Sequence, residues 1–225
     1  MHSQSRTVIS NQHSLAPQLR HTRRWRSYTT AEFVKPIGDA TRVLFQEIDN
    51  RRKAISRPLV LDAGCGNADS SFHLAKRHPN ALVLGIERSP HRLARYGIST
   101  FECKLHGNVI LACMDLIDLW LLAAEHRWRI AHHYLLYPNP WPKRKHWRRR
   151  WHAHPAFDAA LALGGILELR SNWSIYVEEF AAVLRIKTQS EPRIEQVQAP
   201  ATLSPFETKY ARSGHRLLRL KIALP

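Results

Sequence analysis

The segment from Tyr137 to Trp151 carries the densest set of side chains capable of chemistry in this chain. It reads Tyr-Pro-Asn-Pro-Trp-Pro-Lys-Arg-Lys-His-Trp-Arg-Arg-Arg-Trp. Its first part holds three prolines in five positions, and each fixes its own φ and pushes the preceding residue toward extended conformations. The turn is therefore stiff. Asn139 at its apex offers one acceptor oxygen and two donor protons, which complement the edge of a nucleobase.

A run of cations follows this turn. Six of the eight residues from Lys143 to Arg150 are lysine or arginine. Such cations suit a phosphate backbone, and the tryptophans among them can stack on bases or on arginine. The plainer interpretation is a solvated basic helix start whose tryptophans belong to the core. The prolines and the residues upstream favour nucleic acid.

A second group of candidate residues lies at the ends of three expected strands. Asp62, Gly64 and Gly66 follow the first strand, Glu87 ends the second, and Asp115 follows the third. Glycines after a buried strand let the chain turn tightly and let a ligand approach the backbone. An acid about 20 residues further on can accept both ribose hydroxyls of a nucleoside cofactor, and Asp115 is placed to accept from an adenine amino group. Taken singly, each of these residues also fits an ordinary turn or a helix start.

The glycine loop lacks the third glycine of the dinucleotide motif G-x-G-x-x-G, which weakens the case for NAD or FAD. An acid two residues before G-x-G instead resembles the loop of S-adenosylmethionine-dependent methyltransferases. The ordered set of three strand ends thus predicts S-adenosylmethionine as the cofactor.

Short apolar runs alternate with helix-like segments to position these residues. Buried strands are expected over residues 59–63, 82–86, 109–112, 130–136 and 166–169. Helices are expected near residues 69–77, 90–96, 116–125, 150–162 and 173–185, after an amphipathic helix near 39–50 and a basic linker over 51–57. This alternation predicts an α/β fold with a parallel sheet covered on both faces. Residues 193–198 and 215–224 predict two more strands, an antiparallel pair with no helix pattern between them.

Composition points to one domain and a polyanionic partner. The chain has 225 residues, 44% of them hydrophobic, and a formal net charge of +16. That length can bury a full core, and that charge favours nucleic acid. A membrane surface is the competing polyanion, but no basic amphipathic stretch stands out. We expect a flexible basic arm over residues 1–38 and the catalytic domain over 39–225.

Cysteine usage and hydropathy predict the compartment. The three cysteines lack C-x-x-C spacing, so neither a disulfide framework nor a metal site is indicated. No signal-peptide core and no apolar run of about 18 residues is present. We therefore expect a cytoplasmic protein with no membrane partner, and a monomer is favoured.

The residues quoted above resemble a known family, the tRNA (guanine-N7)-methyltransferases, over roughly residues 55–224. The family's segment after its fourth strand reads like Phe-Pro-Asp-Pro-Trp-Pro-Lys-Lys-Arg-His followed by basic residues, and residues 137–150 follow it nearly position by position. Residues 170–173 are similar to the family's Thr-Asp after the fifth strand. Residues 208–211 are similar to its terminal Thr-x-Tyr/Phe-Glu element.

The resemblance implies a Rossmann-like class I methyltransferase with a mostly parallel seven-stranded sheet and helices on both faces. It implies transfer of a methyl group from S-adenosylmethionine to N7 of a guanine in the variable loop of tRNA. Asn139 would take the catalytic position. The cofactor would be held by Asp62, Gly64, Gly66, Glu87 and Asp115. The tRNA and its guanine would be bound by Lys143, Arg144, Arg148, Arg149, Arg150, Asn172, Thr208 and Tyr210.

Three acidic positions of the family pattern are neutral here, namely Asn139, Asn172 and Ala211. A carboxylate can accept from two guanine N–H groups and stabilise positive charge on a methylated ring, whereas an amide offers one acceptor and no charge. Two alternatives therefore stay open. Asn139-Pro140-Trp141 is also close to the Asn-Pro-Pro-aromatic motif of amino-group methyltransferases acting on RNA, DNA or protein. The chain could instead be a non-catalytic RNA-binding relative.

Overall fold

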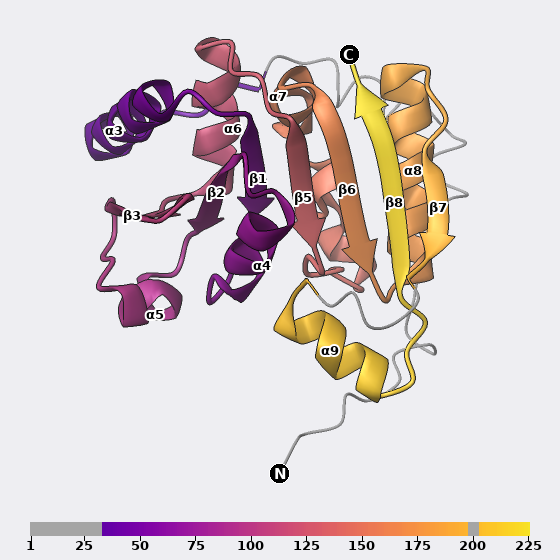
Figure 1. Ribbon diagram of the computed structural model, residues 1–225. Helices are drawn as coiled ribbons and strands as arrows, with labels where there is room; N and C mark the ends of the chain where they lie inside the picture. Colours follow the sequence, from indigo (N-terminus) through magenta and orange to yellow (C-terminus); the bar gives the residue numbers. More distant parts are fainter. Residues whose placement is uncertain (1–32, 198–202) are drawn as a thin grey trace.

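An eight-stranded mixed β-sheet forms the centre of the molecule (Figure 1). The computed structural model describes residues 33–197 and 203–225. The strands are β1 (Leu59–Ala63), β2 (Leu82–Glu87), β3 (Cys103–His106), β4 (Val109–Cys113), β5 (His132–Leu136), β6 (Gly165–Ser171), β7 (Arg193–Gln196) and β8 (Leu218–Leu224). Their order is β3-β4-β2-β1-β5-β6-β8-β7.

The five central strands β4, β2, β1, β5 and β6 are parallel, and the edges are antiparallel. At one edge β8 pairs antiparallel with both β6 and β7, which confirms the expected closing pair. At the other edge β3 pairs antiparallel with β4. This edge strand makes the sheet one strand larger than predicted. It was missed because its sequence Cys-Lys-Leu-His is short and half-exposed, without an apolar run.

Helices cover both faces of the sheet. They are α3 (Asp39–Ile55), α4 (Asp69–Arg77), α5 (Pro90–Leu93), α6 (Leu116–Glu125), α7 (Phe157–Ala162), α8 (Ser174–Thr188) and α9 (Pro205–Arg212). Short 3-10 turns are η2 (Ala94–Tyr96), η3 (Arg144–Arg149) and η4 (Trp151–Ala153). Figure 1 shows α4 in front of β1 and β2, with α6, α7 and α8 behind the sheet.

Alternation along the buried strands builds a core on each face. Val60 of β1 joins the apolar cluster beneath α4, whereas the next residue, Leu61, joins the cluster on the opposite face with Phe180 of α8. Successive strand residues point to opposite faces, and burying each such side chain contributes about 1.5–3 kcal/mol. Both faces of β1 are therefore apolar, as its unbroken hydrophobic run predicts.

Three predicted helical features differ in the structure. Helix α3 continues to Ile55 and so includes much of the predicted basic linker. The predicted helix over 150–162 is regular only in α7, since η3 and η4 come before it. Helix α9 lies between β7 and β8, where none was predicted. Its signals were Ser204 as N-cap, which accepts from the N–H of Glu207, with Pro205 at the first helical position.

Part of the predicted N-terminal arm, residues 1–32, lies outside the described residues, and residues 33–38 have no regular secondary structure. In the described part of the chain, no helix has both the length and the apolar character needed to cross a membrane.

The carboxyl ends of the parallel strands meet at one edge of the sheet, and α9 lies beside that edge (Figure 1). The chain leaves β1 toward β2 and β4 on one side, then returns to β5 on the other. Such a switch point opens a crevice at the carboxyl ends of the strands, where ligands of open α/β sheets bind. The topology therefore places the candidate site between the ends of β1 and β5.

Candidate active site

A cavity of about 490 Å³ opens at this switch point. Its walls come from the glycine turn, the ends of β2 and β4, the proline-rich turn and the segment after it. The lining residues are Gly64, Ile86, Glu87, Arg88, Met114, Asp115, Leu116, Ile117, Asn139, Trp141, Arg149, Trp151 and His154. Two segments far apart in the sequence, the glycine turn and the proline-rich turn, thus face one cavity.

The glycine turn is fastened to the neighbouring strand. The backbone N–H groups of Gly64 and Cys65 both donate to the carbonyl oxygen of Ile86, at 3.0 and 2.8 Å. Gly64 has φ +83° and Gly66 has φ +60°, in the left-handed region that glycine enters without steric cost. The turn therefore places backbone without a side chain, at Gly64, at the edge of the cavity.

Asp62 lies beneath this turn and does not line the cavity. Its side chain is buried, and one carboxylate oxygen accepts from the hydroxyls of Ser70 and Ser71 at 2.6 and 2.7 Å. Burial raises the pKa of Asp62 to about 6, and the two hydroxyl donors oppose that shift. Asp62 thus holds the start of α4, and its role toward the cofactor stays a prediction.

Glu87 ends β2 with its carboxylate at the cavity. One oxygen accepts from the backbone N–H of Gly66 at 3.1 Å, and the other accepts from the N–H of Ser89 at 2.8 Å. Arg92 Nη1 lies 3.7 Å from the carboxylate. A carboxylate has about four lone-pair positions, so Glu87 can accept further donors from a ligand.

Asp115 caps helix α6 and also lines the cavity. One of its carboxylate oxygens accepts from the backbone N–H of Ile117 at 2.8 Å, which leaves capacity for another donor. The side chains of Met114, Leu116 and Ile117 supply an apolar wall beside it. Nearby, burial lowers the pKa of His154, against the opposing effect of the Asp115 charge. This end of the cavity suits a flat ring that carries an amino group.

The proline-rich turn presents Asn139 at the cavity. The Asn139 side-chain oxygen accepts from the backbone N–H of Trp141 at 3.1 Å, an Asx-type bond within the turn. Trp141 has φ +45°, a left-handed conformation that its large side chain rarely adopts. The guanidinium of Arg149 lies 4.8 Å from the centre of the Trp141 ring. The turn is therefore held by local contacts as well as by its prolines.

The basic run divides into exposed and buried members. Lys143, Lys145, Arg148 and Arg149 are exposed, whereas Arg150 is only 3% exposed. Arg150 pairs with Glu179 of α8, so it is internal and not free to grip tRNA as predicted. Arg150 is buried because it is the last residue of the basic run, where the chain packs against α8. The side chain of Arg144, also a predicted tRNA contact, lies outside the described part of the structure.

The other predicted substrate residues gather beside the cavity and do not line it. Asn172 Nδ2 lies 3.0 Å from His215 Nδ1. The Tyr210 ring lies 5.2 Å from that of His215 and 5.6 Å from that of Tyr137. Thr208 Oγ1 lies within 3.5 Å of its own helix, at the carbonyl oxygen of Ser204. Lys143 stays at the surface and does not line the cavity either.

Several lining residues were not predicted. Trp141 and Trp151 belong to the segment singled out in the sequence, and their aromatic character could have indicated a wall. His154 carries no such signal, because only the packing of the segment around η4 directs it toward the cavity. Among the described residues, no group of three or more histidine, cysteine or acidic side chains is arranged to hold a metal ion.

Comparison with known proteins gives matches over most of the chain. A family model described as a putative methyltransferase matches residues 56–220. The chain is similar to the tRNA (guanine-N(7)-)-methyltransferase of Alkalilimnicola ehrlichii, with 32% identity over 72% of this chain and 71% of that protein. It is also similar to the tRNA (guanine-N(7)-)-methyltransferase of Leifsonia xyli subsp. xyli, with 30% identity over 71% of each chain.

Solved structures share the fold at low sequence identity. The 16S rRNA (adenine(1408)-N(1))-methyltransferase of Catenulisporales acidiphilia is similar with a TM-score of 0.54 and 16% identity, over 87% of this chain and 97% of that one. An aminoglycoside resistance methyltransferase is similar with a TM-score of 0.55 and 15% identity, over 80% and 93%. These likenesses confirm the predicted class I methyltransferase fold.

Proposed function

The chain belongs to the tRNA (guanine-N7)-methyltransferase family, and we propose that it transfers the methyl group of S-adenosylmethionine to N7 of a guanine in the tRNA variable loop. One observation carries this proposal beyond the family: Glu87, Asp115 and Asn139, from three separate segments, line a single cavity at the switch point of the sheet. The cavity thus has a place for a nucleoside cofactor and a turn that can meet a second ligand.

The residues fit S-adenosylmethionine. The volume of about 490 Å³ suits a ligand of this size. Glu87 would accept from the ribose hydroxyls, Asp115 would accept from the adenine amino group, and Gly64 would allow close approach of backbone. The cofactor supplies an electrophilic methyl group on a positively charged sulfur. Asp62, bonded to Ser70 and Ser71, would position the start of α4 behind the glycine turn.

Methylation at N7 of guanine requires little acid–base catalysis from the protein. N7 of neutral guanine carries a free lone pair, so no side chain must remove a proton from it before transfer. The protein must instead hold the guanine in line with the methyl group, which is a large contribution by itself. Asn139 and the Trp141 ring, at the mouth of the cavity, would perform this positioning.

The amino-group alternative needs the Asn139 oxygen to accept from an exocyclic amine. Here that oxygen accepts from the backbone N–H of Trp141. The bond shapes the turn and uses one of the two lone pairs of that oxygen, so the family relationship, and not this bond, favours the guanine-N7 proposal over the amino-group one. Methyl transfer also brings positive charge onto the guanine ring, and the acids that line this cavity are Glu87 and Asp115.

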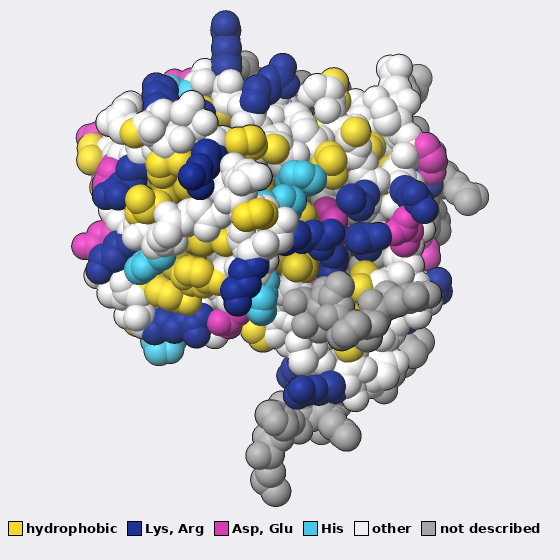
Figure 2. Space-filling model, viewed as in Figure 1, with side chains coloured by type: hydrophobic (Ala, Val, Ile, Leu, Met, Phe, Trp, Pro, Cys, Tyr) yellow, Lys and Arg dark blue, Asp and Glu magenta, His cyan; other side chains and the backbone are white. Residues whose placement is uncertain are grey.

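The surface supports an RNA partner. Figure 2 shows Lys and Arg side chains spread over the face that it displays. In the segment after Asn139, four cations are exposed, namely Lys143, Lys145, Arg148 and Arg149, and Arg149 also lines the cavity. These cations would contact tRNA phosphates on either side of the target base. We further propose a monomer in the reducing cytoplasm. All three cysteines are unpaired, which supports that compartment.

The test is to incubate the purified protein with unmodified tRNA and labelled S-adenosylmethionine, and then to identify the labelled nucleoside. Formation of 7-methylguanosine is expected. A methylated exocyclic amine would instead favour the amino-group alternative. Binding of tRNA with no transfer, under conditions where a family relative is active, would favour the non-catalytic alternative.

A further inference from the structure

Helix α9 is fixed to the sheet by buried charges. Arg170 of β6 pairs with Glu207 of α9, with Nη1 to Oε1 at 2.8 Å, and with Glu168 on its own strand at 2.7 Å. All three side chains are at most 2% exposed. Glu207 also accepts from the backbone N–H of Leu203 at 3.3 Å. These contacts hold α9 at the carboxyl edge of the sheet, beside the proline-rich turn.

The outer side of α9 carries aromatic rings that lead toward the cavity. Phe206 is 46% exposed, and its ring stacks on that of Tyr210 at 6.4 Å with an interplanar angle of 24°. The two residues are four apart and so share one face of the helix. The Tyr210 ring in turn contacts that of Tyr137, two residues before Asn139. A row of three rings therefore runs from the surface of α9 to the turn.

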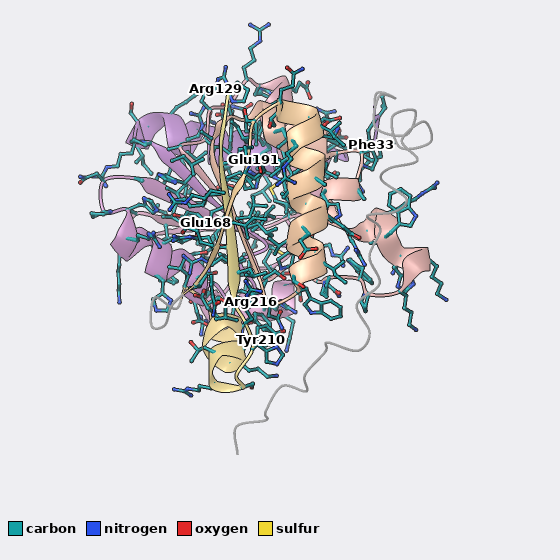
Figure 3. The ribbon with its side chains drawn as sticks, turned by 90° about the vertical axis from the view of Figure 1, so that its right-hand side faces the viewer. Phe33, Arg129, Glu168, Glu191, Tyr210 and Arg216 are labelled. Atoms are coloured by element: carbon teal, nitrogen blue, oxygen red, sulfur yellow. The ribbon has the colours of Figure 1, made fainter. Side chains whose placement is uncertain are left out.

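Cations flank this row. Lys209 and Arg212 on α9 and Arg216 just after it are exposed, while the acid of the helix, Glu207, is buried in its ion pair. Tyr210 belongs to α9, and Arg216 follows between α9 and β8 (Figure 3). An exposed aromatic ring beside such cations is what binds single-stranded nucleic acid, since the ring stacks a base and the cations meet its phosphates.

We infer that α9 binds the nucleotide next to the target guanine, with its base stacked on Phe206 and its phosphates near Lys209 and Arg212. This inference rests on the proposed function. N7 must meet the methyl group inside the cavity, so the target guanine must leave its stack. When the target base leaves its stack, one face of the adjacent base becomes exposed. Phe206 is placed to cover that face.

The test compares tRNA affinity of Phe206→Ala, Phe206→Trp and wild-type protein, each with S-adenosylhomocysteine present. We expect the alanine variant to bind tRNA about tenfold more weakly and the tryptophan variant to bind at least as well as wild type. Phe101→Ala is the matched control, because Phe101 is 47% exposed and lies just before β3, at the opposite edge of the sheet. It should bind tRNA normally.

Salt dependence separates stacking from charge. The loss of affinity in Phe206→Ala should be equal at low and high salt. Lys209→Gln with Arg212→Gln should instead reduce the dependence of log Kd on log salt, by about 0.7–0.9 for each phosphate that is no longer neutralised. Affinity like that of wild type in Phe206→Ala would overturn this inference alone. Wild-type protein that binds no tRNA would overturn both the inference and the proposed function.

Discussion

The guanidinium of Arg150 donates two hydrogen bonds to the carbonyl oxygen of Trp141, from Nε at 3.4 Å and from Nη2 at 3.2 Å. Its remaining nitrogen pairs with Glu179 of α8, and both charged side chains are almost completely buried. The N–H of the same Trp141 donates to the side chain of Asn139. A buried ion pair between Arg150 and Glu179 of α8 therefore fixes the turn that presents Asn139 to the cavity.

Glu179→Gln should destabilise the protein strongly. The change leaves Arg150 buried without its anion, and removing one partner of a buried pair costs about 3–5 kcal/mol. Urea denaturation at neutral pH would measure the free energy of unfolding. Glu47→Gln is the control, because its pair with Arg51 is exposed and should contribute at most about 1 kcal/mol.

A double variant checks the cause of that destabilisation. Arg150→Met with Glu179→Leu removes both charges, so it should be more stable than Glu179→Gln. It should nevertheless methylate tRNA more slowly than wild type, because nothing then holds the Trp141 carbonyl. Equal stability of Glu179→Gln and wild type would show that the pair does not anchor the turn.

Salt dependence of tRNA binding should separate the exposed cations from the buried one. Arg148→Gln and Lys145→Gln should each reduce the slope of log affinity against log salt by about 0.7–0.9, because each removes one cation that meets a phosphate. Arg150→Met with Glu179→Leu also removes a cation but should leave the slope unchanged, since the Arg150 side chain is internal. Arg127→Gln, an exposed change just after α6, is the control and should also leave the slope unchanged. Slopes that do not respond to Arg148 or Lys145 would place the RNA surface elsewhere.

Asn139→Asp should keep or raise the rate of methyl transfer. A carboxylate can still accept from the N–H of Trp141, so the turn is preserved, and its charge stabilises the positive guanine ring. A tenfold gain in kcat corresponds to about 1.4 kcal/mol. Asn139→Ala is the contrast, because it removes the bond and should lower the rate. The measurement is 7-methylguanosine formed per minute on unmodified tRNA, and a lower rate in the aspartate variant would contradict the guanine-N7 role of this side chain.

Glu87→Ala should weaken cofactor binding by about 2 kcal/mol or more, because it removes charge-assisted hydrogen bonds to the ribose. It also frees the N–H of Gly66, which loosens the glycine turn. Titration calorimetry with S-adenosylhomocysteine would measure the dissociation constant. Glu87→Gln keeps an acceptor and should lie between the alanine variant and wild type. An unchanged constant in the alanine variant would place the ribose elsewhere in the cavity.

Stability should depend on pH through Asp62. Its pKa is raised from 3.8 to about 6 in the folded protein, so folding favours the protonated form. The stability that this gives is fully present below the unfolded pKa and is lost as the pH rises through about 6. The free energy of unfolding, relative to that of Asp62→Asn, should fall by about 2 kcal/mol from about pH 4 to about pH 7. A difference that is constant across this range would contradict the raised pKa.

The sequence alone was enough for the five parallel strands and for the two acids, Glu87 and Asp115, that line the cavity. Buried strands read as unbroken apolar runs because both faces of a parallel sheet are covered, so β1, β2 and β4 and the residues after them followed from local pattern. Glu87 and Asp115 share a cavity because parallel strands bring their carboxyl ends to one edge. The edge strand β3 and helix α9 escaped prediction, because neither has an apolar run or a long amphipathic period.

Tertiary structure decided which members of each motif reach a ligand. Arg148, Arg149 and Arg150 are alike in sequence, yet only packing under α8 turns Arg150 into an internal partner of Glu179, 29 residues away. Asp62 precedes the glycines in a cofactor-like motif, yet its side chain is buried and one of its oxygens accepts from both Ser70 and Ser71. Burial and ion pairing depend on segments distant in the chain, and local pattern contains no information about those partners. The sequence therefore indicates which residues are candidates for binding, whereas the tertiary structure decides which of them are exposed to the cavity.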